Sequence, residues 1–282
     1  MQTQQQELCK ELEDMFNLSQ EEMIKIYQLK HASARKDKLE EILNYDCQYF
    51  TYSGADVAYT FDKEGNQKMI LIEINSCPGG LPRCIFPESL KNGEAYQMVL
   101  ENGLLKNLDE KEKKAELAVI YDKNESAAKG LFDALPKERE ATFVKEKRQK
   151  AWTPQIRLNK DTNYLQIKQE NGEWKNLDGI HRHLTYAPWT RLPLFCKTKI
   201  VNHPITCLAG GRNKFIASHA YNFFNETYSK NGFNIETPVT YLAHNARQII
   251  DRQEQSKFLV VKSPFANAGQ DLHLISSKRD AQ

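Results

Sequence analysis

The sequence has no Cys-x-x-Cys pair, no long apolar run and almost no net charge. Its six cysteines are scattered over 282 residues, which argues against a zinc site, and the polar N-terminus lacks the apolar core of a secretory signal. We therefore expect a cytoplasmic protein with reduced thiols. No segment approaches the length of a membrane span, so no membrane partner is expected. A formal net charge of +2 gives no electrostatic reason to expect nucleic acid as a partner.

What is present is the composition of an ordinary globular protein. The chain is 40% hydrophobic and 27% charged, and its length allows one large domain or two modest ones. Helical patterns alternate with strand-like runs rich in aromatic and β-branched residues, which predicts an α/β protein.

Individual elements follow from the hydrophobic periodicity and the turn residues. We expect helix over much of 5–43, strands near 49–52, 57–61 and 69–74, and a helix over 94–105. A linker or solvated helix end is expected at 108–114. Further along, we expect a strand and helix over 117–135, strands near 177–180 and 199–202, a long helix over 212–229, and strands near 258–262 and 272–275.

The first motif with chemical content is Glu73-Ile74-Asn75, which ends an almost continuously apolar strand. Residues two apart on a strand face the same side, so the carboxylate and the amide project together. Oxygen ligands of this kind suit Mg²⁺, which takes one or two protein carboxylates and completes its shell with phosphate oxygens. A solvent-facing edge pair is the alternative. The apolar run predicts a central strand covered on both faces, and ligands bind at the carboxyl ends of such strands, which favours the cation site.

Two lysines stand beside small residues. Lys262 closes an apolar strand and is followed by a loop of small residues, whose backbone amides can approach phosphate oxygens. Lys214 follows Gly210-Gly211 at the start of a predicted helix, where free amides attract anions. When each segment is read alone, a lysine in an ordinary hairpin and a plain glycine turn are the favoured explanations.

A fourth motif is Asp178-Gly179-Ile180-His181-Arg182-His183. His181 and His183 share a strand face, but no third ligand lies at a helpful spacing, which argues against zinc. Arg182 is the better candidate, as a guanidinium that recognises a carboxylate at a strand end. A simple surface charge is the alternative for it.

In this order the motifs resemble the circularly permuted branch of the ATP-grasp ligases, which contains eukaryotic-type glutathione synthetase and glutathionylspermidine synthetase. The resemblance runs from about residue 49 to 274 and is carried by the order of motifs that are each weak alone. The matching segments are Ser53-Gly54-Ala55-Asp56-Val57, Leu71-Ile72-Glu73-Ile74-Asn75 with Gly79-Gly80-Leu81, Leu117–Tyr121, Asp178-Gly179-Ile180 with Arg182, Leu208–Lys214 and Phe258–Lys262.

The resemblance implies an ATP-grasp-like fold with α+β lobes, in three segments. These are a helical N-terminus with the permuted ATP-grasp strands that carry the metal site (1–110), a pre-ATP-grasp α/β substrate domain (111–204) and a partial nucleotide-binding lobe (205–282). It implies an ATP-dependent ligase that joins a small-molecule carboxylate to an amine through an acyl phosphate, with ATP and Mg²⁺ as cofactors. Glu73 and Asn75 would ligate the metal, and Arg182 would hold a substrate carboxylate. The ATP phosphates would contact Lys214, Lys262 and the loop Asn267, Ala268, Gly269 and Gln270.

The sequence also departs from the family. Related loops carry a metal-binding glutamate and several glycines, whereas this loop has Ala266, Asn267 and one glycine, Gly269. The family also continues well past its phosphate loop, to a hinge that recognises adenine. The resemblance thus implies a fragment of a longer ligase or, as the alternative, a truncated relative that serves as a catalytically inactive nucleotide-binding or interaction module.

Overall fold

The computed structural model describes residues 18–47, 49–78, 94–108, 115–137, 139–146, 155–256, 258–266 and 270–281. They form two compact units, and each is described by itself. Unit 1 contains the described residues of 1–54, 76–206 and 230–233, and unit 2 contains those of 55–75, 207–229 and 234–282. These units cut across the three expected segments, because the strands of 55–75 group with the C-terminal part of the chain.

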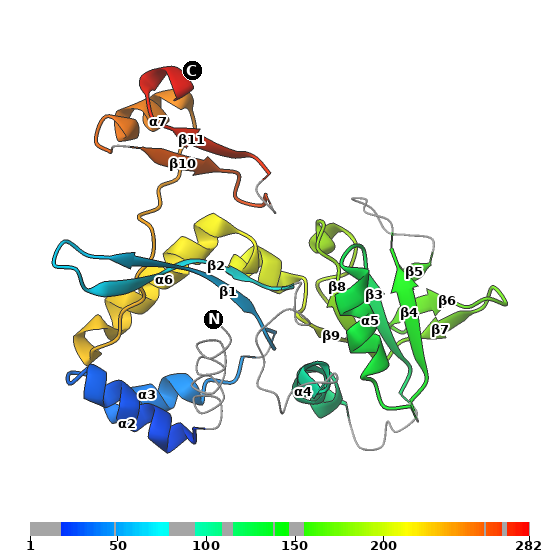
Figure 1. The fold of residues 1–282 in the computed structure, drawn as a ribbon. Coiled ribbons are helices and arrows are strands. Elements are labelled where there is room, and N and C mark those ends of the chain that lie inside the picture. The colour runs from blue at the N-terminus through cyan, green and yellow to red at the C-terminus, as the bar shows by residue number, and fades with distance from the viewer. Residues whose placement is uncertain are drawn as a thin grey trace, which may run out of the picture. The chain divides into compact units, whose positions relative to one another are not determined.

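Unit 1 is built on a parallel four-stranded sheet with the order β4-β3-β8-β9. The central strand β3 is buried at every position because the strands β4 and β8 pair with its two edges and apolar residues pack on its faces. The helix α5 lies against β3 (Figure 1). The bounds are β3 (Leu117–Tyr121), α5 (Glu125–Asp133), β4 (Ala141–Lys145), β8 (Gly179–His183) and β9 (Lys199–Val201).

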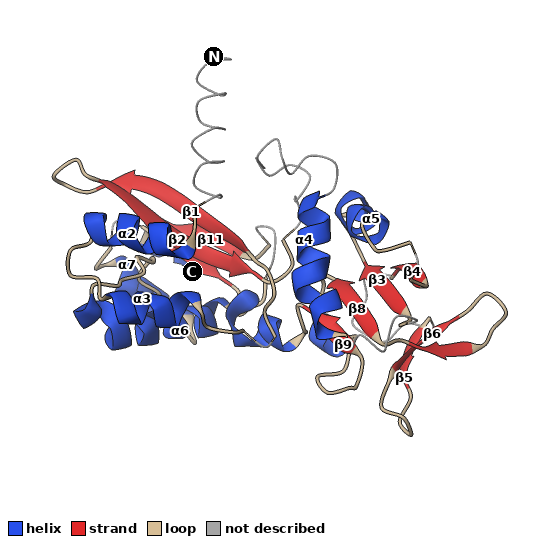
Figure 2. Cartoon of the chain, turned by 90° about the horizontal axis from the view of Figure 1, so that it is seen from below, coloured by secondary structure: helices blue, strands red, loops and turns tan. Residues whose placement is uncertain are grey.

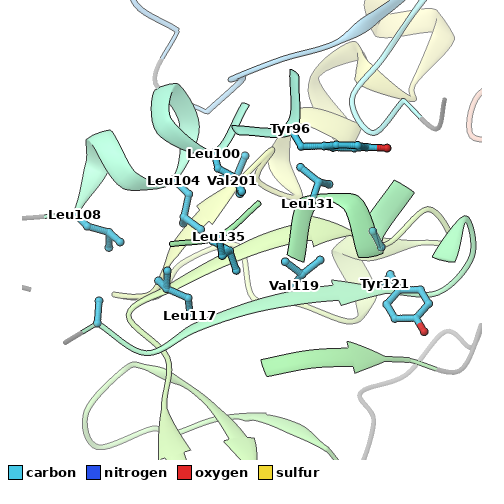
Figure 3. Close-up of a cluster of buried hydrophobic side chains, with 12 residues drawn as sticks. Tyr96, Leu100, Leu104, Leu108, Leu117, Val119, Tyr121, Leu131, Leu135 and Val201 are labelled. Atoms are coloured by element: carbon cyan, nitrogen blue, oxygen red, sulfur yellow. The ribbon is translucent and has the colours of Figure 1, made fainter. Parts of the chain in front are cut away.

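One face of this sheet packs against the helix α4 (Glu94–Gly103), whose apolar side chains point toward β3 (Figure 3). Leu100 and Leu104 are fully buried there, in one cluster with Leu117. Gly179 permits this close approach, since a Cβ on it would lie 2.7 Å from Leu104 Cδ1. The α/β class predicted from the sequence is therefore confirmed for this unit.

A three-stranded antiparallel meander with the order β5-β6-β7 belongs to the same unit (Figure 2). Its strands are short, and they bury Ile156, Leu165 and Ile167 in the second apolar cluster of unit 1. The bounds are β5 (Ile156–Leu158), β6 (Leu165–Lys168) and β7 (Trp174–Asn176).

The long helix expected over 5–43 is seen as two helices within its described part, α2 (Gln20–Lys30) and α3 (Lys36–Leu43). A capping box explains where α2 begins, because Ser19 accepts from the Glu22 amide and Glu22 accepts from the Ser19 amide. The turn between the helices contacts Gly232, which has a φ of 86° and lies so close to Ala34 that no side chain would fit.

Unit 2 contains two separate hairpins and two helices. The hairpin of β1 (Gly54–Phe61) and β2 (Gln67–Asn75) turns at Gly65, whose φ is 84°. Antiparallel pairing joins β10 (Leu259–Lys262) to β11 (Leu272–Ile275). The helices are α6 (Lys214–Tyr228) and α7 (Ala246–Gln253).

Two local predictions are wrong. The strand β2 is not central, because within the described residues its sheet contains only β1 and several of its side chains are exposed. Residues 49–52 form no strand, because the backbone amides of Thr51 and Tyr52 are bound by the side chain of Asn202 instead of a neighbouring strand. The linker expected at 108–114 lies outside the described residues except for Leu108, and no described helix is long and apolar enough to cross a membrane.

Two buried carboxyl groups lie at the carboxyl end of the unit 1 sheet. Asp122 follows β3 and accepts hydrogen bonds from Thr185 and Tyr186 and, at 2.7 Å, from the Arg191 guanidinium. Glu146 follows β4, is 3% exposed, and has no hydrogen-bond partner at either carboxyl oxygen among the described residues. Burial raises the pKa of Glu146 to about 7, although the positive charge of Arg191 acts in the opposite direction.

Replacing Asp122 should destabilise unit 1 strongly. Its side chain and that of Arg191 are 0% and 1% exposed, so Asp122→Ala leaves a buried guanidinium without its counter-ion. We expect urea denaturation to show a loss of about 3 to 5 kcal/mol. The control is Asp133→Ala, which breaks an exposed pair with Lys129 and should cost about 1 kcal/mol or less. Equal losses in the two variants would contradict the assignment.

Glu146 should make the stability of the protein depend on pH. Its pKa is about 7 in the folded chain against 4.5 in the unfolded chain, so the folded state holds more protons between these values. The free energy of unfolding should therefore fall as the pH rises from 4.5 to 7. Glu146→Gln should remove this component and raise stability at pH 8, relative to the parent chain, by about 1 to 3 kcal/mol. Identical pH profiles from denaturant titrations of the two proteins would contradict the prediction.

Candidate functional site

Unit 2 contains a cavity of about 730 Å³ whose described lining comes from five separate segments of the chain. These segments are the end of β2, the turn that leads into α6 with the first part of that helix, an extended stretch over 237–243, the helix α7, and β10 with the turn that follows it. Residues far apart in the sequence therefore face one space. Most of the lining is apolar, and the charged side chains belong to a few positions.

Glu73 and Asn75 both line this cavity from the end of β2, as the two-residue spacing predicted. The Asn75 amide nitrogen donates to Asp56 on β1 at 3.3 Å. That bond turns the nitrogen toward Asp56 and leaves the amide oxygen on the other arm of the group. Glu73 and Asn75 thus bring a carboxylate and an amide group to the same end of β2.

The turn before α6 is shaped by Gly210, which has a φ of 128°. Glycine is needed there for the conformation, because a side chain at this φ would be strained even though a Cβ would make only ordinary contact with Ala217. The helix then begins after Asn213, whose side chain accepts from the amides of Phe215 and Ile216. This turn carries Gly210, Gly211, Arg212 and Lys214 to the wall of the cavity.

Lys214 contacts two other segments of the wall, the end of β2 and the turn after β10. Its ammonium nitrogen lies 3.4 Å from a Glu73 carboxylate oxygen and donates to the Ala266 carbonyl at 2.7 Å. Its backbone amide donates to the Pro264 carbonyl at 3.1 Å. Lys214 therefore connects the end of β2 to the turn after β10.

The charge of the cavity is strongly positive. Among its described lining residues, Glu73 is the only acidic one, against four basic ones. The basic side chains are Arg212, Lys214, Arg252 and Lys262. Such a wall attracts an anion of several charges more strongly than a neutral molecule.

Aromatic residues lie among the aliphatic ones in the wall. Tyr241 lies in the extended stretch, and the Arg252 guanidinium stacks 4.0 Å from the centre of its ring. Burial, followed by the negative charge of Glu73, raises the pKa of the Tyr221 hydroxyl on α6. The sequence analysis missed Tyr241, Arg252 and Tyr221 because single aromatic and basic residues on helices and loops carry no local signal of a shared cavity.

The predicted phosphate loop is only partly described. Asn267, Ala268 and Gly269 lie outside the described residues, while Gln270 is exposed and is not among the residues that line the cavity. Lys262 does line it, next to Pro264 and Ala266.

The donor set fits a hard cation and does not fit zinc. Within the described residues there is no group of three or more histidine, cysteine, aspartate or glutamate side chains able to hold a metal. One carboxylate and one amide oxygen are nevertheless enough for Mg²⁺ when phosphate oxygens complete its shell. Glu73 and Asn75 therefore suit a magnesium ion that arrives with a phosphate ligand.

Arg182 lies in unit 1, and its side chain is fully buried. All three guanidinium nitrogens donate to backbone carbonyls, those of Asn202, Leu184 and Ser76. A guanidinium bound in this way offers no accessible donor to a substrate. The geometry therefore favours a structural role for Arg182 over the carboxylate-binding role that was expected.

The two histidines beside it belong to the same buried region. Burial lowers the pKa of His181 well below its ordinary value, and in the part of the chain that the structure describes neither of its ring nitrogens has a hydrogen-bond partner. His183 Nδ1 lies 3.6 Å from the Cys77 sulfur. Burial alone would raise the pKa of the Cys77 thiol, but the charges of His183 and Arg182 outweigh it and lower that pKa.

Comparison with known proteins adds no family to this description. No family model matches the chain, and no curated protein matches it in sequence. The functional argument therefore rests on the residues of the site and on the resemblance described above.

The role of Arg182 can be tested by stability alone. Arg182→Met keeps the apolar stem but removes a donor from three buried carbonyls, of which the Ser76 carbonyl keeps its bond from the Asn202 side chain, so we expect a loss of about 2 to 4 kcal/mol in the free energy of unfolding. Arg212→Met is the control, because Arg212 lies at the wall of the cavity and is partly exposed, and it should change stability by less than about 1 kcal/mol. An Arg182→Met protein of parental stability would contradict the structural role.

Proposed function

We propose that this chain carries the nucleotide and metal site of an ATP-dependent carboxylate–amine ligase of the ATP-grasp kind. One observation carries the proposal: Glu73, Asn75, Lys214 and Lys262, from three distant segments, line a single cavity. These are the residues that the resemblance assigned to the metal and the phosphates. A chance resemblance between local motifs gives no reason for them to meet.

The charge of the cavity supports a polyphosphate ligand. Lys214 and Lys262 would pair with phosphate oxygens, and Arg212 adds a third positive charge at the same wall. Glu73 and Asn75 would hold Mg²⁺, whose role in such sites is to neutralise phosphate charge and to align the reacting groups. The apolar stretch with Tyr241 leaves room for the rest of a nucleotide.

The reaction has two steps. An oxygen of the substrate carboxylate attacks the γ-phosphorus of ATP, so that an acyl phosphate forms and ADP leaves. The amine then attacks the acyl carbon, the amide bond forms, and inorganic phosphate and a proton leave. Lys214 and Lys262 would stabilise the negative charge that develops on the transferred phosphoryl group.

A second candidate function is a nucleotide-binding module without turnover. It is favoured by the presence of a single acidic side chain, Glu73, among the described residues that line the cavity. The two functions differ in one measurement. A ligase releases ADP when both an acid and an amine are present, whereas the module binds Mg–ATP and releases none.

The proposal predicts which residues ADP release requires. With Mg–ATP and a panel of carboxylic acids and amines, Glu73→Gln and Lys262→Met should each lower the rate of ADP release by about a hundredfold or more. Lys68→Met should leave it unchanged, because Lys68 lies on the same strand as Glu73 but pairs with Glu236 away from the cavity lining. Undiminished turnover in either site variant would remove the site from the reaction.

A further inference from the structure

The ammonium group of Lys214 forms an ion pair with the Glu73 carboxylate, which is proposed to bind the metal. Its nitrogen lies 3.4 Å from Glu73 Oε2, and the two side chains are 24% and 28% exposed. The pair is thus better shielded from water than an ion pair on an open surface, and its attraction is correspondingly stronger. A divalent cation that binds Glu73 must compete with a positive charge already present.

The same ammonium group also holds the turn that follows β10. It donates to the Ala266 carbonyl at 2.7 Å, and the Lys214 backbone amide fixes the Pro264 carbonyl at 3.1 Å. Because one nitrogen makes both the Glu73 and the Ala266 contacts, a ligand that draws it away from Glu73 also loosens its bond to Ala266. The two events are therefore linked through a single side chain.

The oxygens of a polyphosphate would relieve the competition between the Lys214 ammonium group and the metal ion for the Glu73 carboxylate. They give the ammonium new acceptors, and they supply the oxygen ligands that one carboxylate and one amide cannot provide to a magnesium ion. The other lysine of the cavity differs in this respect, because Lys262 has no ion pair within the described part of the chain.

We propose that Lys214 is the counter-ion of Glu73 while no ligand is bound and also holds the Ala266 turn by a hydrogen bond. A divalent metal therefore binds well only together with a polyphosphate ligand. The proposal deepens the function above and rests on it for the identity of the ligand. Its physical content, which is competition between an ammonium group and a metal for one carboxylate, is tested without turnover.

The experiment measures binding of Mn²⁺ alone to the full chain, from the electron paramagnetic resonance signal of the free ion. Lys214→Met should tighten this binding about fivefold, since it removes the competing charge. Lys214→Arg should restore the parental value, because the guanidinium can pair with Glu73 again. Lys68→Met, which also removes one positive charge from unit 2, should leave it unchanged.

A second measurement adds inorganic tripolyphosphate. It should tighten Mn²⁺ binding by the parent chain, and the enhancement should be smaller in Lys214→Met, where competition is already absent and one phosphate partner is missing. Circular dichroism spectra and thermal melting curves establish that each variant is folded. For Lys214→Met, this check matters most because the Ala266 contact is lost.

The outcomes separate this inference from the proposed function. Unchanged or undetectable Mn²⁺ binding by a folded Lys214→Met protein overturns the counter-ion role, even if the chain proves to be a ligase. Equal tightening by Lys214→Met and Lys68→Met overturns it as well, because a general charge effect would then explain the result. Tighter binding in Lys214→Met alone supports the role, even if no combination of acid and amine releases ADP.

Discussion

A single ammonium group, that of Lys214, joins the end of β2 to the turn after β10 at the wall of the unit 2 cavity. Lys214 reaches Glu73 on one side and the Ala266 carbonyl on the other, and its backbone fixes Pro264. The turn at Gly210 and the cap at Asn213 decide where α6 begins and therefore where this lysine stands. The charged wall of the cavity consequently depends on a few polar contacts between segments that are far apart in the sequence.

Unit 1 is held by a different kind of interaction. Its sheet buries charged groups that most proteins keep at the surface, and it satisfies them by hydrogen bonds to the backbone. The guanidinium of Arg182 donates hydrogen bonds to three backbone carbonyls. Asp122 forms an ion pair with Arg191 and accepts hydrogen bonds from Thr185 and Tyr186. Glu146 is the exception, since its carboxyl oxygens have no hydrogen-bond partner among the described residues and burial raises its pKa. The desolvation cost of such groups is large, so each of them is informative about how the unit is assembled.

The sequence predicted most elements because their hydrophobic periods are clear. The strands at 117–121 and 259–262 and the helix over 214–228 lie where those periods placed them. The sequence-based prediction was wrong where the structure of a segment depends on which other segment it pairs with. Residues 49–52 have the composition of a strand, but their amides are bound by Asn202, which is distant in the sequence. The apolar run of β2 predicted cover on both faces, whereas its described neighbours form only a two-stranded hairpin.

The sequence by itself determined the α/β class, the common face of Glu73 and Asn75 and the position of Lys214 at a helix start, because these follow from local backbone geometry. Only the tertiary structure decided which of these groups meet. It brought Lys214 to Glu73 at the wall of one cavity, added Tyr241 and Arg252 to that wall, and buried Arg182 among carbonyls. The reason is physical: periodicity determines the direction in which a side chain points, whereas its partners depend on contacts between segments that are far apart in the chain.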